Sequence, residues 1–213
     1  MLEENLESTY YFDLEHPAIQ ELVAEFKNPN LSEIEKAKQF YLKVRDGWRY
    51  NPYDIKFRKE ALRSSYIAQK DHGHCIDKSI LYISGLRALG IPAKLHLAKV
   101  KNHIAVERLI EKFGTNELTP HGMVDVYLNG KWVKATPAFN QELCQLTGVE
   151  PLEFNGEEDS IFQEYNEKGK EFMEYLDDYG SFSDVPLDFI ERNMKENYPK
   201  LESLLNDAGE LKL

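Results

Sequence analysis

One cysteine of the chain lies in a setting that suits nucleophilic chemistry. Cys75 follows a glycine-containing turn, Asp71-His72-Gly73-His74, and begins the apolar pattern of a helix. In the first turn of a helix, unpaired N–H groups and the positive end of the dipole favour thiolate over thiol. Since the thiolate is the reactive form, this position predicts a nucleophile. Cys144 has no such setting and is expected to pack as a small apolar residue.

His121 is the best placed of the six histidines to serve as the base that a thiol nucleophile needs. It opens a predicted strand, and a strand packed against a helix N-terminus allows a cysteine and a distant histidine to meet. On position alone, the simpler interpretation is that His121 lies at a strand edge and has no catalytic role. The interpretation as a base therefore depends on the neighbours of His121.

A predicted hairpin indicates where the third member of such a site must lie. Asn129-Gly130 separates two alternating runs, which is a strong signal for a two-residue turn. The resulting register places Thr136 one diagonal from His121, at roughly 7–8 Å between backbones, so that its side chain can reach the imidazole. Asp125 shares this strand face but lies about 13 Å along the strand, which is too far.

Helix and strand patterns surround these residues. Ser32 and Glu35 form a capping box at the start of one predicted helix. The apolar stripe that follows Cys75 ends at Gly90, and Pro92 prevents the helix from resuming. The other predicted elements are helices over 16–26, 104–113, 159–178 and 187–197, and strands over 93–100, 122–128 and 131–135.

The two segments around Cys75 and His121 resemble the transglutaminase-like core domain of the papain-like cysteine protease superfamily. Gly73-x-Cys75-x-Asp77, followed by the Leu-Arg-Ala-Leu-Gly-Ile-Pro-Ala run of 86–93, is similar to the nucleophile segment of that family. Residues 121–133 are similar to its histidine strand. The resemblance covers about residues 30–140, and two motifs in the right order make it specific.

The resemblance implies an α+β, papain-like fold, in which a cysteine-bearing helix packs on an antiparallel sheet that bears the histidine. It also implies catalysis through a thioester, as in proteases, amidases and protein cross-linkers, with Cys75 and His121 as the catalytic pair. Some members of the family have lost activity. The resemblance implies no cofactor and no metal.

The third catalytic position departs from the family pattern. The family places Asp four residues after the tryptophan, where this chain has Thr136 before Pro137. A hydroxyl can accept a hydrogen bond from imidazole, but it does not stabilise imidazolium as a carboxylate does. Asn140 is the alternative, since papain-like proteases use an Asn in this role. Gln69 and Trp48 are candidate donors to an oxyanion, although each is more simply interpreted as an ordinary surface or core residue.

Two other kinds of site fit the sequence less well. His72, His74 and Cys75, with His121, offer imidazole and thiolate to a zinc ion, but the usual zinc spacings are absent. The tyrosines and phenylalanines of residues 162–198 can line a binding groove, but at helical spacing such residues more often form core.

Composition excludes several classes of protein. Two cysteines do not make a disulfide framework, and no run approaches the ~20 apolar residues of a membrane span. The net charge of −11 belongs to residues 151–213, with 17 acids and 6 bases, whereas residues 1–150 hold 20 of each. No basic stripe indicates nucleic-acid binding, and the acidic N-terminus lacks signal-peptide features, so a cytoplasmic location is expected.

The sequence therefore predicts a transglutaminase-like catalytic core with N-terminal helices over residues 1–150, and an acidic helical extension packed on it over residues 151–213. The expected activity is thiol-dependent acyl transfer at an amide or peptide bond, with hydrolysis favoured over cross-linking. The expected substrate is a protein, a peptide or a small amide. The alternative is a catalytically impaired fold that binds proteins or peptides.

Overall fold

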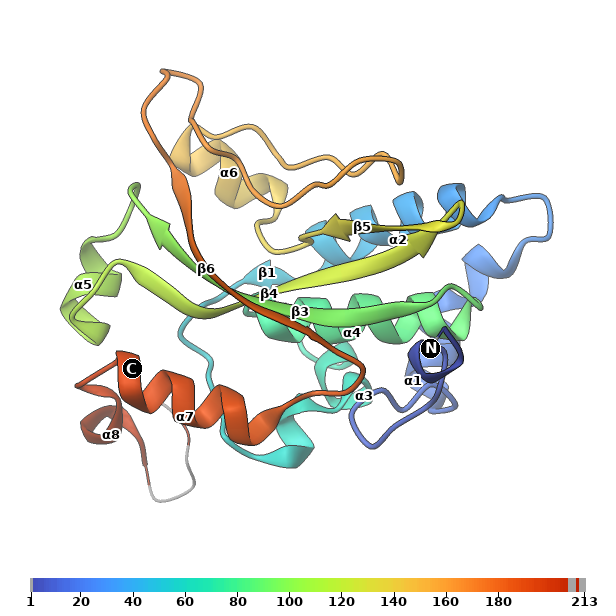
Figure 1. The fold of residues 1–213 in the computed structure, drawn as a ribbon, viewed down its shortest axis with the longest axis horizontal. Coiled ribbons are helices and arrows are strands. Elements are labelled where there is room, and N and C mark those ends of the chain that lie inside the picture. The colour runs from blue at the N-terminus through green and yellow to red at the C-terminus, as the bar shows by residue number, and fades with distance from the viewer. Residues whose placement is uncertain (1, 207–209, 211–213) are drawn as a thin grey trace.

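The computed structural model describes residues 2–206 and 210, which form a four-stranded antiparallel sheet with helices packed against it (Figure 1). The strands are β3 (Ala93–Asn102), β4 (Glu117–Leu128), β5 (Lys131–Ala135) and β6 (Met173–Phe182), in the order β5-β4-β3-β6. A short parallel ladder joins β1 (Arg49–Tyr50) to β2 (His72–Gly73). The architecture is α+β, as predicted.

Helices account for much of the remaining described chain. They are α1 (Pro17–Val23), α2 (Glu33–Gly47), α3 (Ser64–Ala68), α4 (Cys75–Ala88), α5 (Glu107–Phe113), α6 (Gln141–Thr147), α7 (Leu187–Asn197) and α8 (Leu201–Leu204). The predicted capping box is confirmed at the start of α2, where Ser32 and Glu35 bond each other's backbone N–H groups. Within the described residues, no helix combines the length and the apolar character that crossing a bilayer requires.

The central helix, α4, is buried along almost its whole length between α2 and the sheet. His74 caps its start, since Nδ1 of the imidazole accepts the backbone N–H groups of Ile76 at 3.1 Å and Asp77 at 3.3 Å. The predicted stop is also confirmed, because Gly90 takes a left-handed φ of 80° just after the helix. The sequence therefore places the Cys75 thiol at the beginning of this helix.

The hairpin has the predicted register, with Leu128 opposite Lys131 in β4 and β5. β4 is irregular just before this hairpin, since His121 pairs with Ala98 but Leu118 pairs with Val100. One extra residue on β4 therefore forms a bulge beside His121. Bulges bend a strand and redirect the neighbouring side chains.

The residues of β4 alternate between the two faces of the sheet. A Cβ atom at Gly122 would lie 2.9 Å from Cα of Ile76, so this position faces the start of α4. Val124 follows on the same face and belongs to the main core. In a regular strand, His121 and Asp125 therefore leave the strand on the opposite face.

The chain after residue 150 is not the purely helical extension that the sequence predicted. The helix predicted over 187–197 is confirmed as α7, but the helix predicted over 159–178 is wrong. Part of that range belongs to β6, which pairs with β3 from Asn102–Met173 to Leu95–Phe182. Glu and Lys residues produced the local helical signal, and pairing with a strand distant in the sequence overrides it. The sheet therefore includes residues from both sides of the predicted boundary at residue 150.

Candidate active site

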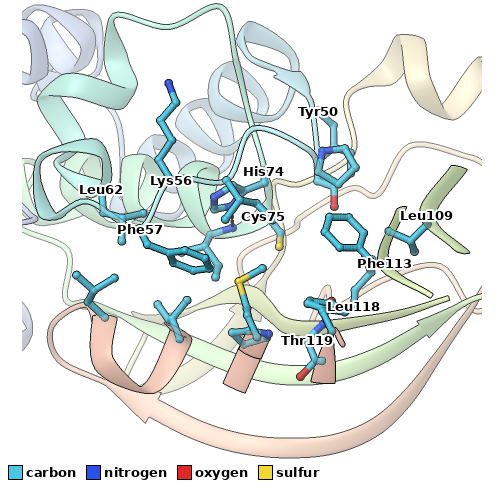
Figure 2. Close-up of a pocket in the computed structure, with 18 residues that line it drawn as sticks. Tyr50, Lys56, Phe57, Leu62, His74, Cys75, Leu109, Phe113, Leu118 and Thr119 are labelled. Carbon is cyan, nitrogen blue, oxygen red and sulfur yellow. Dashed lines mark hydrogen bonds between the residues drawn. The ribbon is translucent and has the colours of Figure 1, made fainter. Parts of the chain in front are cut away.

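Cys75 begins α4, and its sulfur points into a pocket (Figure 2). The backbone N–H groups of Gly122, Ile76 and Cys75 itself act on the sulfur to lower the pKa of the thiol. Two of these groups come from the first turn of α4, and the third comes from β4. The helix start and the strand therefore surround the thiol with groups that stabilise a negative sulfur.

Burial nevertheless keeps the resting thiol protonated. Loss of solvent raises the pKa of Cys75 to about 11, although the N–H groups of Gly122 and Ile76 act in the opposite direction. The sequence predicted a lowered pKa. That prediction is wrong for the resting protein, because the donors at a helix start can be inferred from local sequence, whereas the side chains that cover the thiol come from distant segments.

The pocket over Cys75 is a narrow cavity of about 50 Å³ with mainly apolar walls. Its lining includes Ile55, Phe57 and Leu62 from the segment before α3, Leu109 and Phe113 from α5, Leu118 and Thr119 from β4, and Leu187, Ile190 and Met194 from α7. The amine of Lys56 points away from it (Figure 2). The pocket therefore suits an apolar group close to the thiol.

α7 is fastened to β4 through hydrogen bonds at Thr119. The Thr119 hydroxyl donates to Oδ1 of Asn193 at 2.8 Å, and the Thr119 N–H donates to the Tyr198 hydroxyl at 2.7 Å. Tyr198 in turn donates to the carbonyl of Glu117 at 3.1 Å. These bonds hold α7 in place as one wall of the pocket.

His121 is not hydrogen-bonded to Cys75 in this structure. Its side chain is buried, and neither Nδ1 nor Nε2 has a hydrogen-bond partner among the described residues. Burial lowers the pKa of His121 to about 4, so the imidazole is neutral at pH 7. The residue of β4 that contacts the sulfur is the next one, Gly122, through its backbone N–H.

Thr136 and Asn140, the two predicted orienting residues, are buried, and neither is bonded to His121. The Thr136 hydroxyl has no hydrogen-bond partner among the described residues. Asn140 accepts the backbone N–H of Tyr50 at 3.0 Å, and the Tyr50 phenol contacts the Cys75 thiol. Asn140 therefore positions the chain beside the pocket.

The two predicted side-chain donors to an oxyanion are occupied elsewhere. Nε2 of Gln69 donates to the carbonyl of Ser65 at 2.9 Å, and Nε1 of Trp48 donates to the carbonyl of Ile67 at 3.1 Å. Near Cys75, the structure provides the backbone N–H of Gly122 from outside α4 and the Tyr50 phenol, which contacts the thiol.

The histidines considered for a zinc site are likewise occupied. His72 lies between Asp71 and Asp54, with N–O distances of 2.6 and 3.0 Å. His74 uses Nδ1 to cap α4. Within the described part of the chain, these histidines do not form a metal-ligand group with Cys75 and His121. Cys144 is buried, as expected of a packing residue.

Sequence reasoning did not identify three neighbours of the thiol. Tyr50 lies in the short strand β1, about 25 residues before Cys75 in the sequence. Gly122 follows His121, and the absence of a side chain allows its close approach to Ile76. Tyr198, whose pKa is raised by burial and by the nearby Cys75, belongs to the aromatic residues of 162–198 that were considered as a groove, but the sequence does not show that it reaches Cys75.

Comparison with known proteins agrees with the resemblance. The sequence pattern of the transglutaminase-like superfamily matches residues 20–137, more than half of the chain. The chain therefore belongs to the transglutaminase-like superfamily. The matched range includes Cys75, His121 and Thr136, and ends before Asn140.

A solved structure from Cytophaga hutchinsonii, described as a candidate cysteine protease, is similar to this chain at 15% identity and a TM-score of 0.49. The match covers 64% of this chain and 42% of that one, so it spans less than half of that protein's length. No curated protein matches the sequence.

Proposed function

We propose that the protein transfers acyl groups from amide or peptide bonds through a thioester at Cys75, and that hydrolysis is favoured over cross-linking. The observation that carries this proposal is the environment of the sulfur. It begins α4, lies where the backbone N–H groups of Gly122, Ile76 and Cys75 lower the pKa of the thiol, and faces an apolar pocket. The same N–H groups can stabilise the oxyanion that forms when a carbonyl is attacked.

The proposed reaction needs a base, and His121 is our candidate. Its side chain leaves β4 on the face opposite Gly122 and is not among the residues that line the pocket, so the proposal requires the imidazole to turn toward the sulfur when substrate binds. As the sulfur bonds to the carbonyl carbon, the S–H proton passes to the base and then to the departing amine. Water next breaks the C–S bond, which releases the acid and restores the thiol. His74 cannot take this role without giving up the cap of α4, whereas both nitrogens of His121 are free of partners among the described residues.

The pocket walls support a substrate with an apolar acyl group. The side chains that surround the thiol are almost all aliphatic or aromatic, and among the described residues no carboxylate lines the cavity. Hydrolysis is favoured because cross-linking requires an amine to compete with water at a shielded site. A protein, a peptide or a small amide with an apolar residue on the acyl side meets these conditions.

The second candidate function is a binding module that has kept the transglutaminase-like fold. The specific observation in its favour is that the imidazole of His121 makes no hydrogen bond to Cys75, while Thr136 replaces the family's Asp. In this case the apolar pocket binds a side chain of a peptide without reaction.

Trapping of the acyl intermediate separates the two functions. The full-length protein is incubated with N-acyl amino acid p-nitroanilides that carry Phe or Glu on the acyl side, and adducts at Cys75 are located by mass spectrometry. We expect an adduct sensitive to hydroxylamine, at least about tenfold faster turnover with Phe, and a loss of about 100-fold or more in His121→Ala. Cys75→Ser is the inactive control. Absence of both adduct and turnover, with retained binding of the Phe compound, would leave the binding module as the function.

A further inference from the structure

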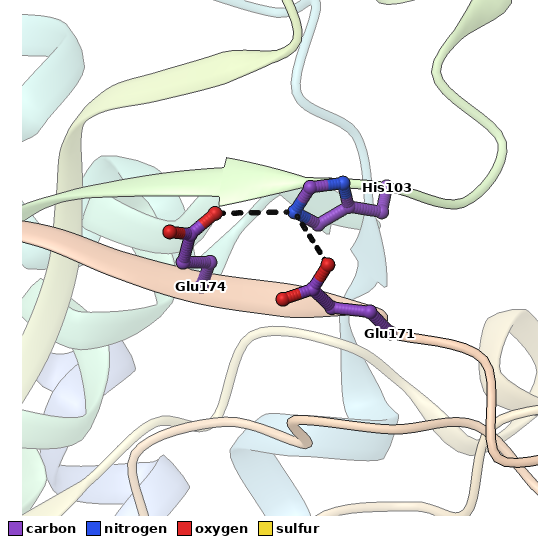
Figure 3. A group of neighbouring side chains, drawn as sticks. All are labelled: His103, Glu171 and Glu174. Atoms are coloured by element: carbon purple, nitrogen blue, oxygen red, sulfur yellow. Dashed lines mark ion pairs between the residues drawn. The ribbon is translucent and has the colours of Figure 1, made fainter.

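A histidine and two glutamates meet where β3 and β6 begin to pair, away from the thiol (Figure 3). His103 directly follows β3, and its backbone N–H donates to the carbonyl of Phe172 at 2.8 Å. Glu174 lies on β6 opposite Lys101, and Glu171 precedes that strand. The ladder between the two strands therefore fixes the backbones of all three residues.

The spacing of their side-chain atoms suits one metal ion. Nε2 of His103 lies 3.4 Å from a carboxylate oxygen of Glu174 and 3.6 Å from one of Glu171, and the three ligand atoms lie within 4.8 Å of one another. Four ligands at about 2.1 Å from a tetrahedral ion are separated by about 3.4 Å. The observed separations are therefore close to those that a zinc-sized ion requires.

The imidazole nitrogen of His103 is directed at the two carboxylates. Nε2 of His103 is shielded from solvent and makes no hydrogen bond within the described residues, although it faces both carboxylates. Buried polar atoms normally make hydrogen bonds, but the nearest acceptors of this nitrogen are the two carboxylates at 3.4 and 3.6 Å, which is longer than an ordinary hydrogen bond. Across the described chain, neither Glu171 nor Glu174 forms an ion pair with any lysine or arginine. The two neighbouring carboxylates therefore lack a lysine or arginine countercharge among the described residues.

We propose that His103, Glu171 and Glu174 bind one divalent transition-metal ion of the zinc class, with water as a further ligand. One imidazole and two carboxylates suit such an ion, whereas Ca²⁺ and Mg²⁺ prefer shells made of oxygen atoms alone. The ion ties the end of β3 to the start of β6. Asn102, Ile104 and Phe172, which adjoin the ligands in sequence, line a second cavity next to Tyr50, so the ion also stabilises that wall.

Metal titration of the full-length protein tests the site. Co²⁺ is followed by its visible absorption, because binding through nitrogen and oxygen produces no thiolate-to-metal charge-transfer band and is thereby distinguished from binding at Cys75 or Cys144. We expect one Co²⁺ per chain without that band, displacement by Zn²⁺, and a rise in Tm with Zn²⁺ but not with Mg²⁺ or Ca²⁺.

Variants assign the ligands. Glu171→Gln and Glu174→Gln, which preserve side-chain shape at exposed positions, are each expected to weaken Zn²⁺ binding at least about tenfold, and His103→Ala more. Glu167→Gln, an exposed glutamate of the same segment outside the cluster, is expected to bind as wild type does. If His103→Ala fails to fold, the Zn²⁺ affinities of Glu171→Gln and Glu174→Gln decide whether the cluster is the site. No saturable binding at one equivalent, or unchanged affinity in both glutamine variants, overturns the proposal.

Discussion

At the residue scale, the candidate site contains buried polar groups that the fold leaves without partners. His121 has no hydrogen bond at either nitrogen among the described residues, and neither has the Thr136 hydroxyl. Burial of a polar group without a hydrogen bond destabilises a protein, so such groups are often retained for function. The sequence could identify Cys75 and His121 by motif, but the contacts of their side chains depend on the bulge in β4 and on the cover from α7.

Replacement of His121 by Leu is expected to separate stability from activity. At pH 7, an apolar side chain of similar volume removes two unpartnered nitrogens, so the free energy of unfolding should be unchanged or slightly higher while turnover is lost. In the wild-type protein, the pKa of His121 is about 4 when folded and 6.5 without the fold. Between these values only the unfolded chain binds the proton, so stability falls as pH decreases, by about 3 kcal/mol in total.

Urea unfolding at pH 7 and at pH 4 measures this effect. The wild-type protein should lose about 3 kcal/mol more than His121→Leu between the two values. Equal pH dependence in wild type and His121→Leu would contradict the assignment of a buried neutral imidazole.

Lys78 is a second buried group whose contacts the sequence does not reveal. Its amine donates to the carbonyls of Arg45 at 2.7 Å, Trp48 at 2.8 Å and Ala138 at 2.6 Å. Lys78→Met leaves these three acceptors buried without a donor, and we expect a loss of about 3 kcal/mol in the free energy of unfolding. Lys38→Met, at an exposed position of α2, should change it by less than about 0.5 kcal/mol. Denaturant unfolding compares the two, and equal stabilities would show that the carbonyls find other partners.

At the element scale, local signals account for much of the fold around Cys75. The capping box predicted the start of α2, Gly90 the end of α4, and Asn129-Gly130 the register of β4 with β5, because each signal acts within a few residues. The sequence did not predict β6, because its partner β3 is about 80 residues away in the sequence and because the residues around β6 favour a helix. The limits of α7 were predicted, but its position over Cys75 was not, because the two are also distant in the sequence.

Loosening of α7 is expected to expose the thiol. Asn193→Ala removes the hydrogen bond from Thr119, worth about 1 kcal/mol, which should raise the population with α7 displaced about fivefold. Alkylation of Cys75 by iodoacetamide should accelerate by that factor. The midpoint of its pH profile should fall from about 11 toward the value of an exposed thiol, because burial is the main cause of the raised pKa.

Site-specific mass spectrometry follows this alkylation, with Cys144 as an internal reference. Glu196→Ala, on the exposed side of α7, is the matched control and should leave the rate unchanged. If Asn193→Ala and Glu196→Ala alkylate Cys75 at the wild-type rate over the whole pH range, α7 does not limit access to the thiol.

At the scale of the whole molecule, the site is assembled from segments that are distant in the sequence. Cys75 comes from α4, Gly122 from β4, and the pocket walls include α5 and α7. The sequence indicated a core that ends near residue 150, because the charge changes there and the family resemblance stops. The sheet and the pocket instead extend into the acidic segment, so a charge boundary does not mark a structural one here.

A chain shortened to residues 1–150 tests this inference. It lacks β6, which exposes the edge of β3, and it lacks the buried side chains of α7 that cover Cys75. We expect no cooperative unfolding transition by circular dichroism, together with exposed apolar surface that binds a hydrophobic dye and favours aggregation. The matched control is a nicked full-length protein, cleaved near residue 168 in an exposed turn, in which both pieces are present and the transition should remain. A cooperative transition of wild-type midpoint in the shortened chain would restore the division at residue 150, because it would show that the first 150 residues form their own core without β6 and α7.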